Sequence, residues 1–279
     1  MQAMSDENQL MKGKRGLVMG IANDHSIAWG IARTLAAQGA EMAFTFQGET
    51  LEKRVRPLAE KAGASLVMPC DVEDVASMEA LFQTLDESWG SLDFLVHAIA
   101  FSDKAELNGK FLDTTPRNFA RTMHVSCFSF THLARLARPL MAANGDGGGS
   151  LLTLSYFGAQ RVMPDYNVMG VAKAALETSV KYLAVDLGPE GIRVNAISAG
   201  PMRTLAGSAI GSARKIYGYS EKNAPLRRPV SLDQLGGAAL YLLSDLSSGV
   251  TGEIHYVDSG FNIKGMPKIG DEAVNTKLR

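Results

Sequence analysis

The chain has 279 residues, 46% of them hydrophobic, and a formal net charge of −1 at pH 7. A chain of this size and composition can bury a large core without metals or disulfides. Its near-neutral charge, with no run of five or more basic residues, argues against nucleic acid as the main partner. Residues 1–10 lack the basic start and apolar core of a signal peptide, and no apolar run approaches about 18 residues, so we expect no membrane association.

Cysteine and histidine usage points to a reducing compartment and to no metal. Cys70 and Cys127 are the only cysteines, and both stand in apolar segments. This pattern favours buried, reduced thiols, as in a cytoplasmic protein. The five histidines show no metal-ligand spacing with carboxylate or thiolate support, so no metal site is expected.

Short apolar segments alternate with longer segments of helical period, which predicts a parallel sheet with helices on both faces. The predicted strands are 17–19, 41–46, 66–70, 94–99, 151–154, 192–197 and 254–257. The predicted helices are a run that ends at Gly39, then 47–62, 75–89, 118–142 with a late break at Pro139, a run that carries Tyr166 and Lys173, and 232–243. No repeat or linker divides this order. We therefore expect one α/β domain over residues 1–279, a Rossmann-like doubly wound fold with seven strands and flexible tails at 1–11 and 264–279.

Tyr166 and Lys173 lie seven residues apart, nearly two turns of a helix, so both side chains would share one face. A phenol there can donate to an oxygen that gains negative charge, and the ammonium would keep the phenol acidic. The alternative is an amphipathic helix with an exposed lysine and a half-buried tyrosine, and the spacing alone does not decide between them.

In such a sheet the ligand lies across the carboxyl ends of the strands. Gly20 follows the first strand and opens a turn into a helix, with Ser26 near the first turn, where free amides would suit a pyrophosphate. The next glycine is Gly30, so the G-x-G-x-x-G fingerprint is missing and a plain strand–turn–helix fits as well. Asp71, after the third strand, would either meet adenine or cap the next helix.

Several separated motifs carry a family resemblance. They are Gly20-x5-Ser26-Ile27-Ala28-x-Gly30, Cys70-Asp71-Val72, LLTLSY at 151–156, YNVMG at 166–170 with Lys173, RVNAISAGP at 193–201 and VDSG at 257–260. Over roughly residues 12–261 the chain resembles short-chain dehydrogenases/reductases, and within them the bacterial NADH-using enoyl-[acyl-carrier-protein] reductases.

The position of the tyrosine separates this family from its carbonyl-reducing relatives. Those relatives place a catalytic tyrosine four residues before the lysine and a serine thirteen before that tyrosine. Here the two positions hold Met169 and Tyr156, and Tyr166 stands about one turn, or ~5 Å, earlier than Met169. A donor moved back by one turn suits an enoyl thioester, in which charge collects on the carbonyl oxygen, two carbons from the carbon that accepts hydride.

The resemblance implies roles residue by residue. The catalytic residues would be Tyr156, Tyr166 and Lys173. NADH would be bound by Gly20, Ser26, Ile27, Gln47, Asp71, Val72, Ile99, Lys173, Met202, Arg203, Thr204, Leu205 and Ala206. The substrate would meet Ser102, Tyr156, Tyr166, Met169 and Ile210, under a lid formed by the segment after strand six.

Cofactor choice and partners complete the prediction. Gln47 is followed by Gly48 and Glu49, which leaves no base ready for a 2′-phosphate and favours NADH. The resemblance implies acyl carrier protein as the partner that carries the enoyl thioester. The apolar faces of 119–140 and 168–187 exceed what one sheet can cover, which with the resemblance indicates a homotetramer. A carbonyl-reducing dehydrogenase and a non-catalytic dinucleotide sensor remain as alternatives.

Overall fold

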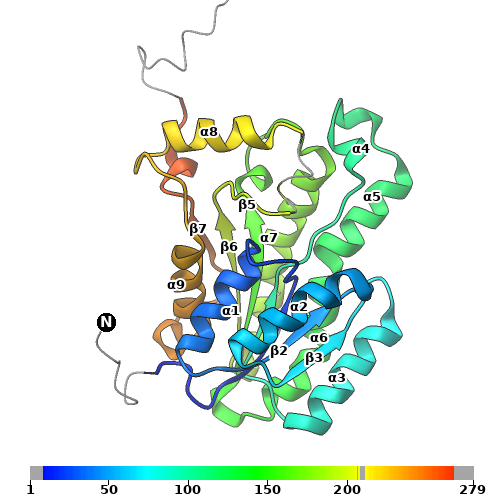
Figure 1. The fold of residues 1–279 in the computed structure, drawn as a ribbon, viewed down its shortest axis with the longest axis vertical. Coiled ribbons are helices and arrows are strands. Elements are labelled where there is room, and N and C mark those ends of the chain that lie inside the picture. Colours follow the sequence, from blue (N-terminus) through cyan, green and yellow to red (C-terminus); the bar gives the residue numbers. More distant parts are fainter. Residues whose placement is uncertain (1–8, 206, 208–210, 267–279) are drawn as a thin grey trace, which may run out of the picture.

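The computed structural model describes residues 9–205, 207 and 211–266, and it contains the predicted seven-stranded parallel sheet, in the order β3-β2-β1-β4-β5-β6-β7. The strands are β1 Arg15–Met19, β2 Glu41–Phe46, β3 Leu66–Pro69, β4 Phe94–His97, β5 Gly149–Tyr156, β6 Ile192–Ala199 and β7 Ile254–Val257. The α-helices are α1 Ile27–Ala37, α2 Gly48–Ala62, α3 Val75–Trp89, α4 Lys104–Leu107, α5 Pro116–Met123, α6 Ser129–Ala142, α7 Asn167–Leu187, α8 Ala213–Asn223 and α9 Leu232–Leu243. Figure 1 shows the sheet between two layers of helices.

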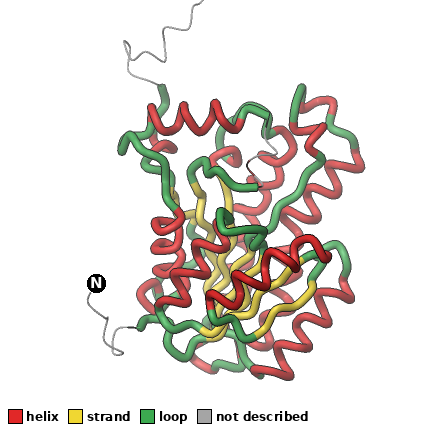
Figure 2. Tube along the Cα trace, viewed as in Figure 1, coloured by secondary structure: helices red, strands yellow, loops and turns green. Residues whose placement is uncertain are grey.

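Two hydrophobic cores lie on opposite faces of the sheet because successive strand residues point to opposite sides. Leu17, Leu95 and Leu151 face α3, α6 and α7, whereas Val18 and Leu152 face α1, α2 and α9. Figure 2 shows the same arrangement, with the strands in yellow and helices on either side. The near-continuous apolar strands of the sequence are therefore explained by burial on both faces.

Glycines allow two of the covering helices to approach closely. A Cβ at Gly30 of α1 would lie 2.8 Å from Leu232 Cβ of α9. Gly236 of α9 is equally confined, since a Cβ there would lie 2.9 Å from the carbonyl oxygen of Gly30. Gly30, which belonged to the nucleotide motif in the sequence, thus has a packing role between helices.

The predicted helix 118–142 is present as one uninterrupted helical segment, but the predicted break at Pro139 is wrong. The helix α5 begins at Pro116, a π-helical turn follows over His124–Phe128, and α6 continues through Pro139 to Ala142. Ser126 decides this change, because its Oγ accepts a 2.9 Å hydrogen bond from Phe101 N and donates one of 3.0 Å to Phe101 O. The turn is thereby tied to the loop after β4.

Other boundaries differ by a few residues. The strand β4 ends at His97, two residues before the predicted end, and β5 extends to Tyr156. The predicted tail 1–11 is too long, since Met11 is fully buried and donates a backbone hydrogen bond of 3.0 Å to Gln38 O. Within the described part of the chain, no helix is both long and apolar enough to cross a membrane.

Candidate active site

The predicted site residues gather at the carboxyl ends of the strands. In the observed order β1 lies between β2 and β4, so the chain reverses its direction of strand addition between β1 and β4. Ligands of doubly wound sheets bind at this switch point. Gly20 follows β1 and Ile99 lies two residues beyond β4, while Tyr156 is the last residue of β5. The parallel sheet therefore brings these segments to one edge.

Two tyrosines and a methionine form the apolar part of the site. The rings of Tyr156 and Tyr166 meet edge to face, with centroids 5.1 Å apart. Tyr166, Met169, Ala172 and Leu107 form one buried cluster, against which Tyr156 packs. Tyr156 Oη is buried without a hydrogen-bond partner among the described residues. Such a wall of aromatic and thioether groups, with hydroxyls inside it, suits a thioester and its acyl chain.

Tyr166 does not lie within the helix, contrary to the prediction. It is the N-cap residue of α7, and its neighbours Asp165 and Asn167 have φ values of 56° and 37°. The left-handed backbone conformation on either side places the Tyr166 side chain at the N-terminal end of α7. The spacing to Lys173, on the second turn of α7, still brings both side chains into the buried region, since they are 8% and 6% exposed.

Lys173 is held by a main-chain carbonyl. Its Nζ donates a 2.7 Å hydrogen bond to Leu154 O on β5. Burial lowers the pKa of its ammonium to about 8, against the raising influence of Cys127 and Glu177. The group therefore keeps its charge at neutral pH and loses it in mildly alkaline solution.

The expectation that Lys173 makes the phenol acidic is wrong in this structure. Burial raises the pKa of Tyr166, and Tyr156 and Glu177 raise it further. Burial also raises the pKa of Tyr156. Both phenols are therefore neutral O–H groups that donate hydrogen bonds.

The loop after β1 has the shape that a pyrophosphate needs. Gly20 has φ 95°, and a Cβ there would collide with the carbonyl of Ala98. Ser26 Oγ accepts hydrogen bonds of 3.0 and 3.1 Å from the amides of Ala22 and Asn23, so it fixes the loop. Ser26 forms no side-chain cap on α1, so the amides of Ile27 and Ala28 are uncapped, whereas those of Trp29 and Gly30 donate to Ser26 O.

Gln47 and Asp71 follow β2 and β3 at the same edge. Gln47 is the N-cap residue of α2, and its exposed side chain makes no cap hydrogen bond. Asp71 does not cap α3. The N-cap residue is Asp74, whose side chain accepts a hydrogen bond from Ala76 N. Asp71 Oδ1 instead accepts 2.9 Å from Glu73 N. Val72 is 6% exposed and packs in the core, and its carbonyl oxygen lies 3.3 Å from His124 Nε2.

The predicted contacts at the nicotinamide end are only partly brought together. Ile99 is half-buried at the edge of the core. Ser102 is already engaged, since Thr122 Oγ1 donates to its hydroxyl at 2.9 Å and Asn118 Nδ2 at 3.2 Å. Its hydroxyl therefore braces the loop against α5 instead of facing the site.

The segment after β6 holds the remaining predicted contacts. Thr204 Oγ1 accepts 2.9 Å from Gly207 N, and the Arg203 guanidinium lies 4.3 Å from the ring centre of Tyr217 on α8. Met202 is half-buried and Leu205 is 48% exposed. Ala206 and Ile210 lie outside the described residues. Figure 1 shows α8, in yellow, beyond the ends of β5 and β6.

Sequence reasoning missed two buried polar groups beside the site. His97 at the end of β4 makes 2.9 Å hydrogen bonds with Thr153 and Ser129. Glu177 on α7 accepts 2.6 Å from Ser155 Oγ. Glu177 stands four residues after Lys173 on a largely apolar helix, and that spacing is the signal by which it could have been found.

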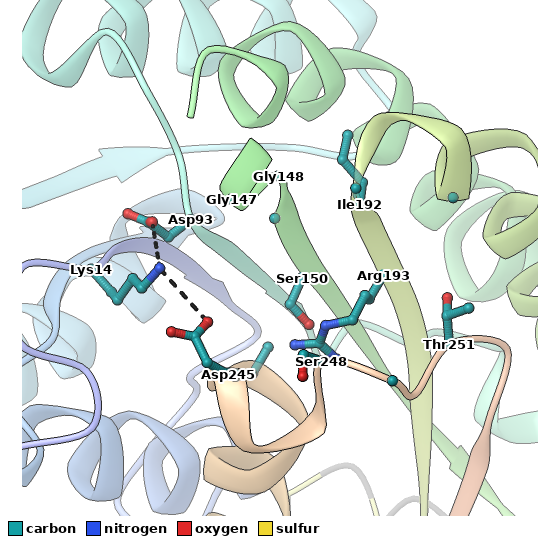
Figure 3. A pocket seen from close by; sticks show the side chains of 15 residues that line it. Lys14, Asp93, Gly147, Gly148, Ser150, Ile192, Arg193, Asp245, Ser248 and Thr251 are labelled. Atoms are coloured by element: carbon teal, nitrogen blue, oxygen red, sulfur yellow. Dashed lines mark ion pairs between the residues drawn. The ribbon is translucent and has the colours of Figure 1, made fainter. Parts of the chain in front are cut away.

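A hollow of about 360 Å³ lies at the opposite end of the sheet, lined by glycines and by Lys14, Asp93, Arg193 and Asp245 (Figure 3). Its charged groups hold one another. Lys14 Nζ lies 3.5 Å from Asp93 and 3.9 Å from Asp245, and Arg193 donates to the carbonyls of Ser244 and Val250. It also lies at the amino ends of β5 and β6, so it is not the dinucleotide site.

The sheet order defines the class of the fold, that of the doubly wound dinucleotide-binding domains. The family model described as "Enoyl-(Acyl carrier protein) reductase" matches residues 20–262. The chain is 63% identical over 262 residues, 94% of this chain and 96% of the relative, to an enoyl-[acyl-carrier-protein] reductase [NADH] of Rhizobium meliloti.

Solved structures agree. The fold matches the corresponding reductase of Anaplasma phagocytophilum in complex with NAD, at TM-score 0.90 and 58% identity, over 94% of this chain and 98% of that chain. It matches the Candidatus Liberibacter asiaticus protein at TM-score 0.90 and 56% identity, over 93% and 99%. The chain belongs to the enoyl-[acyl-carrier-protein] reductase family, and the predicted resemblance is confirmed.

Proposed function

We propose that this protein uses NADH to reduce the carbon–carbon double bond of a trans-2-enoyl thioester carried by acyl carrier protein, the last step of the fatty-acid elongation cycle. The position of the catalytic phenol carries the proposal. Met169, four residues before Lys173, is an apolar residue in the buried cluster, and the hydroxyl comes instead from Tyr166 at the mouth of α7. That arrangement favours a substrate whose oxygen lies beyond the carbon that receives hydride.

The residues present fit NADH. Gly20 lets the loop after β1 pack against the Ala98 carbonyl, and α1 offers amides without a side-chain cap. Gln47 and the neighbouring Glu49 stand at the end of β2, where a 2′-phosphate would have to lie. Repulsion from Glu49 at contact distance would cost a 2′-phosphate about 1–4 kcal/mol per charge pair, depending on the effective dielectric. We therefore assign NADH as the preferred cofactor.

When bound, NADH supplies the hydride for Cβ of the enoyl group. Tyr166, as a neutral phenol, would donate a hydrogen bond to the thioester oxygen as negative charge collects there, and Cα would then take a proton from solvent to give the saturated thioester. One preorganised donor of this kind contributes about 2.7–4 kcal/mol to lowering the barrier. Lys173, fixed on Leu154 O, directs its remaining N–H groups to the ribose hydroxyls. Tyr156 stacks edge to face on Tyr166 and so fixes the ring that donates.

NADH oxidation, followed at the nicotinamide absorbance, tests the reaction. We expect oxidation with a crotonyl thioester and none with a ketoacyl thioester. Tyr166→Phe should lower kcat with the crotonyl thioester about 10²–10³-fold and leave NADH affinity nearly unchanged. Tyr156→Phe is the matched control, since it removes the neighbouring hydroxyl from the same cluster. Oxidation with the ketoacyl thioester alone would favour a carbonyl reductase, and no oxidation with either would favour a dinucleotide sensor.

We infer that the acyl chain enters between the cluster around Met169 and a lid formed by the segment after β6, of which Met202, Thr204 and Leu205 are described. Small and apolar residues of this segment suit a cover that opens and closes over an acyl chain. Arg214 and Lys215 are exposed on α8 beside it, and they give an acidic carrier protein a complementary surface. We expect an Arg214→Glu variant to bind the carrier-bound substrate more weakly than the wild type does. Its turnover of crotonyl-CoA should be retained.

We also infer one domain over the whole chain and a homotetramer in the cytoplasm. Exposed apolar side chains on one side of the molecule support self-association: Phe128, Val171, Tyr182 and Val185 are 51%, 38%, 71% and 76% exposed. Both cysteines are buried free thiols, which suits a reducing compartment. Light scattering should give four times the chain mass for the wild type and a smaller species for Tyr182→Glu, and cell fractionation tests the location.

A further inference from the structure

Glu177 is a buried carboxylate in α7, one turn after Lys173, and the residue is 7% exposed. Its Oε1 accepts a 2.6 Å hydrogen bond from Ser155 Oγ, and its Oε2 accepts one of 3.4 Å from Gln160 Nε2. Burial of a carboxylate is costly unless neighbouring donors hold it. The neutral donors here stabilise the charge without cancelling it.

Three hydroxyl groups, on neighbouring strands, lie on the face of the sheet that α7 covers with Glu177. The strand register pairs Ser155 with Ser198 on β6, and Ser198 with Tyr256 on β7. Paired residues of parallel strands point to the same face, and Ser155 reaches Glu177 on that face. The hydroxyls of Ser198 and Tyr256 are buried without hydrogen-bond partners among the described residues. Burial raises the pKa of Tyr256, and Glu177 raises it further. The groups around the Glu177 carboxylate are therefore neutral hydroxyls.

Three titratable groups from three elements interact electrostatically with Lys173: Cys127 and Glu177 raise its pKa, and Lys173 lowers the pKa of His97. His97 on β4 is neutral, because burial lowers its pKa to about 3. Cys127 in the π-helical turn is a neutral thiol, because burial raises its pKa. Glu177 is the third, and it raises the pKa of Lys173. Of the three groups, Glu177 is the one carboxylate, and its charge attracts the ammonium.

Two other cations near Glu177, on α7 and beside Gln160, lie in solvent. Lys181, four residues further along α7, and Arg161, next to Gln160, are both exposed. Among the described residues, no salt bridge to Glu177 occurs, and Lys173 is not in direct contact with it. The buried charge of Glu177 thus has Lys173 as its nearest buried cation along the helix face.

We propose that Glu177 is a positioning residue whose negative charge keeps the Lys173 ammonium protonated and seated on the Leu154 carbonyl while the thioester is reduced. The proposal rests on the proposed function, since it assumes that charged Lys173 holds the cofactor ribose. Burial brings the pKa of Lys173 to about 8 even with Glu177 in place. Without that charge a larger fraction of Lys173 would be neutral at working pH.

The test is the pH profile of kcat/KM for crotonyl thioester, which reports ionisations of the free enzyme. Glu177→Gln keeps the shape and the acceptor for Ser155 but removes the charge. We expect it to move the alkaline limb down by about one pH unit, which is about a fivefold loss of kcat/KM at pH 8. Glu177→Asp, which keeps the charge, should restore most of the shift. The pH dependence of NADH affinity, measured by fluorescence, should move in parallel.

Two further variants make the result independent of damage to the fold. Glu190→Gln removes one negative charge from the exposed pair with Arg138, beyond the far end of α7, and should leave the alkaline limb in place. Gln160→Glu adds a charge at an exposed position beside Glu177, and should move the limb to higher pH by a smaller amount. If wild type reduces the thioester but neither Glu177→Gln nor Gln160→Glu moves the limb, the proposal is wrong. If wild type does not reduce the thioester, the proposed function is wrong instead.

Discussion

Acid should destabilise this protein through His97 before any carboxylate titrates. His97 is fully buried at the end of β4, between Thr153 and Ser129, and burial lowers the pKa of its imidazole to about 3 from an ordinary value of 6.5. Between these two values the unfolded chain binds a proton that the folded chain does not. Stability is therefore complete above pH 6.5 and falls as the pH drops toward 3.

The size of the effect follows from the two pKa values. Each pH unit inside the window costs about 1.4 kcal/mol of unfolding free energy, and the loss from pH 7 to pH 5 is about 2 kcal/mol. Such a loss is a large part of the stability of an ordinary domain. The carboxylates with lowered pKa values, Glu73, Glu106 and Glu190, contribute only below about pH 4.5.

Urea unfolding of wild type and His97→Gln at pH 7 and pH 5 measures this difference. The variant loses about 1 kcal/mol per missing hydrogen bond at both pH values, but it has no imidazole to titrate. The wild type should therefore lose about 2 kcal/mol more than the variant on acidification. The comparison cancels His132, whose pKa burial also lowers. Equal losses in the two proteins would show that His97 is not the acid-sensitive group.

Three further variants have defined outcomes. Gly20→Ala places a Cβ against the Ala98 carbonyl at φ 95°, which costs about 1–2 kcal/mol from the backbone alone, and NADH fluorescence titration should detect almost no binding. Asp74→Ala removes the N-cap of α3 and should lower the urea-derived stability by about 1 kcal/mol with KM for NADH unchanged. Arg121→Ala breaks the 2.7 Å salt bridge that holds Glu73 in the loop after β3. It should raise KM for NADH a few-fold and leave kcat unchanged. A change in kcat alone would contradict this.

Much of the fold follows from local patterns. Alternation of apolar strands with helical periods predicted all seven strands and the two-faced sheet, because burial on both faces demands continuous apolar strands. The π-helical turn escaped prediction, since residues 124–128 continue the helical pattern of their neighbours. Contacts of Ser126 with Phe101 decide the turn, and those residues are 25 positions apart in the chain.

For the site, the sequence by itself determined which residues stand at the ends of strands and how Tyr166 and Lys173 are spaced, because strand ends and helical spacing are local properties. Only the tertiary structure decided the charge states. Burial keeps the phenols neutral and lowers the pKa of Lys173 to about 8. Burial in turn depends on every element that packs around a group. The same is true of Glu177, whose neutral hydroxyl surroundings arise only when β5, β6, β7 and α7 come together.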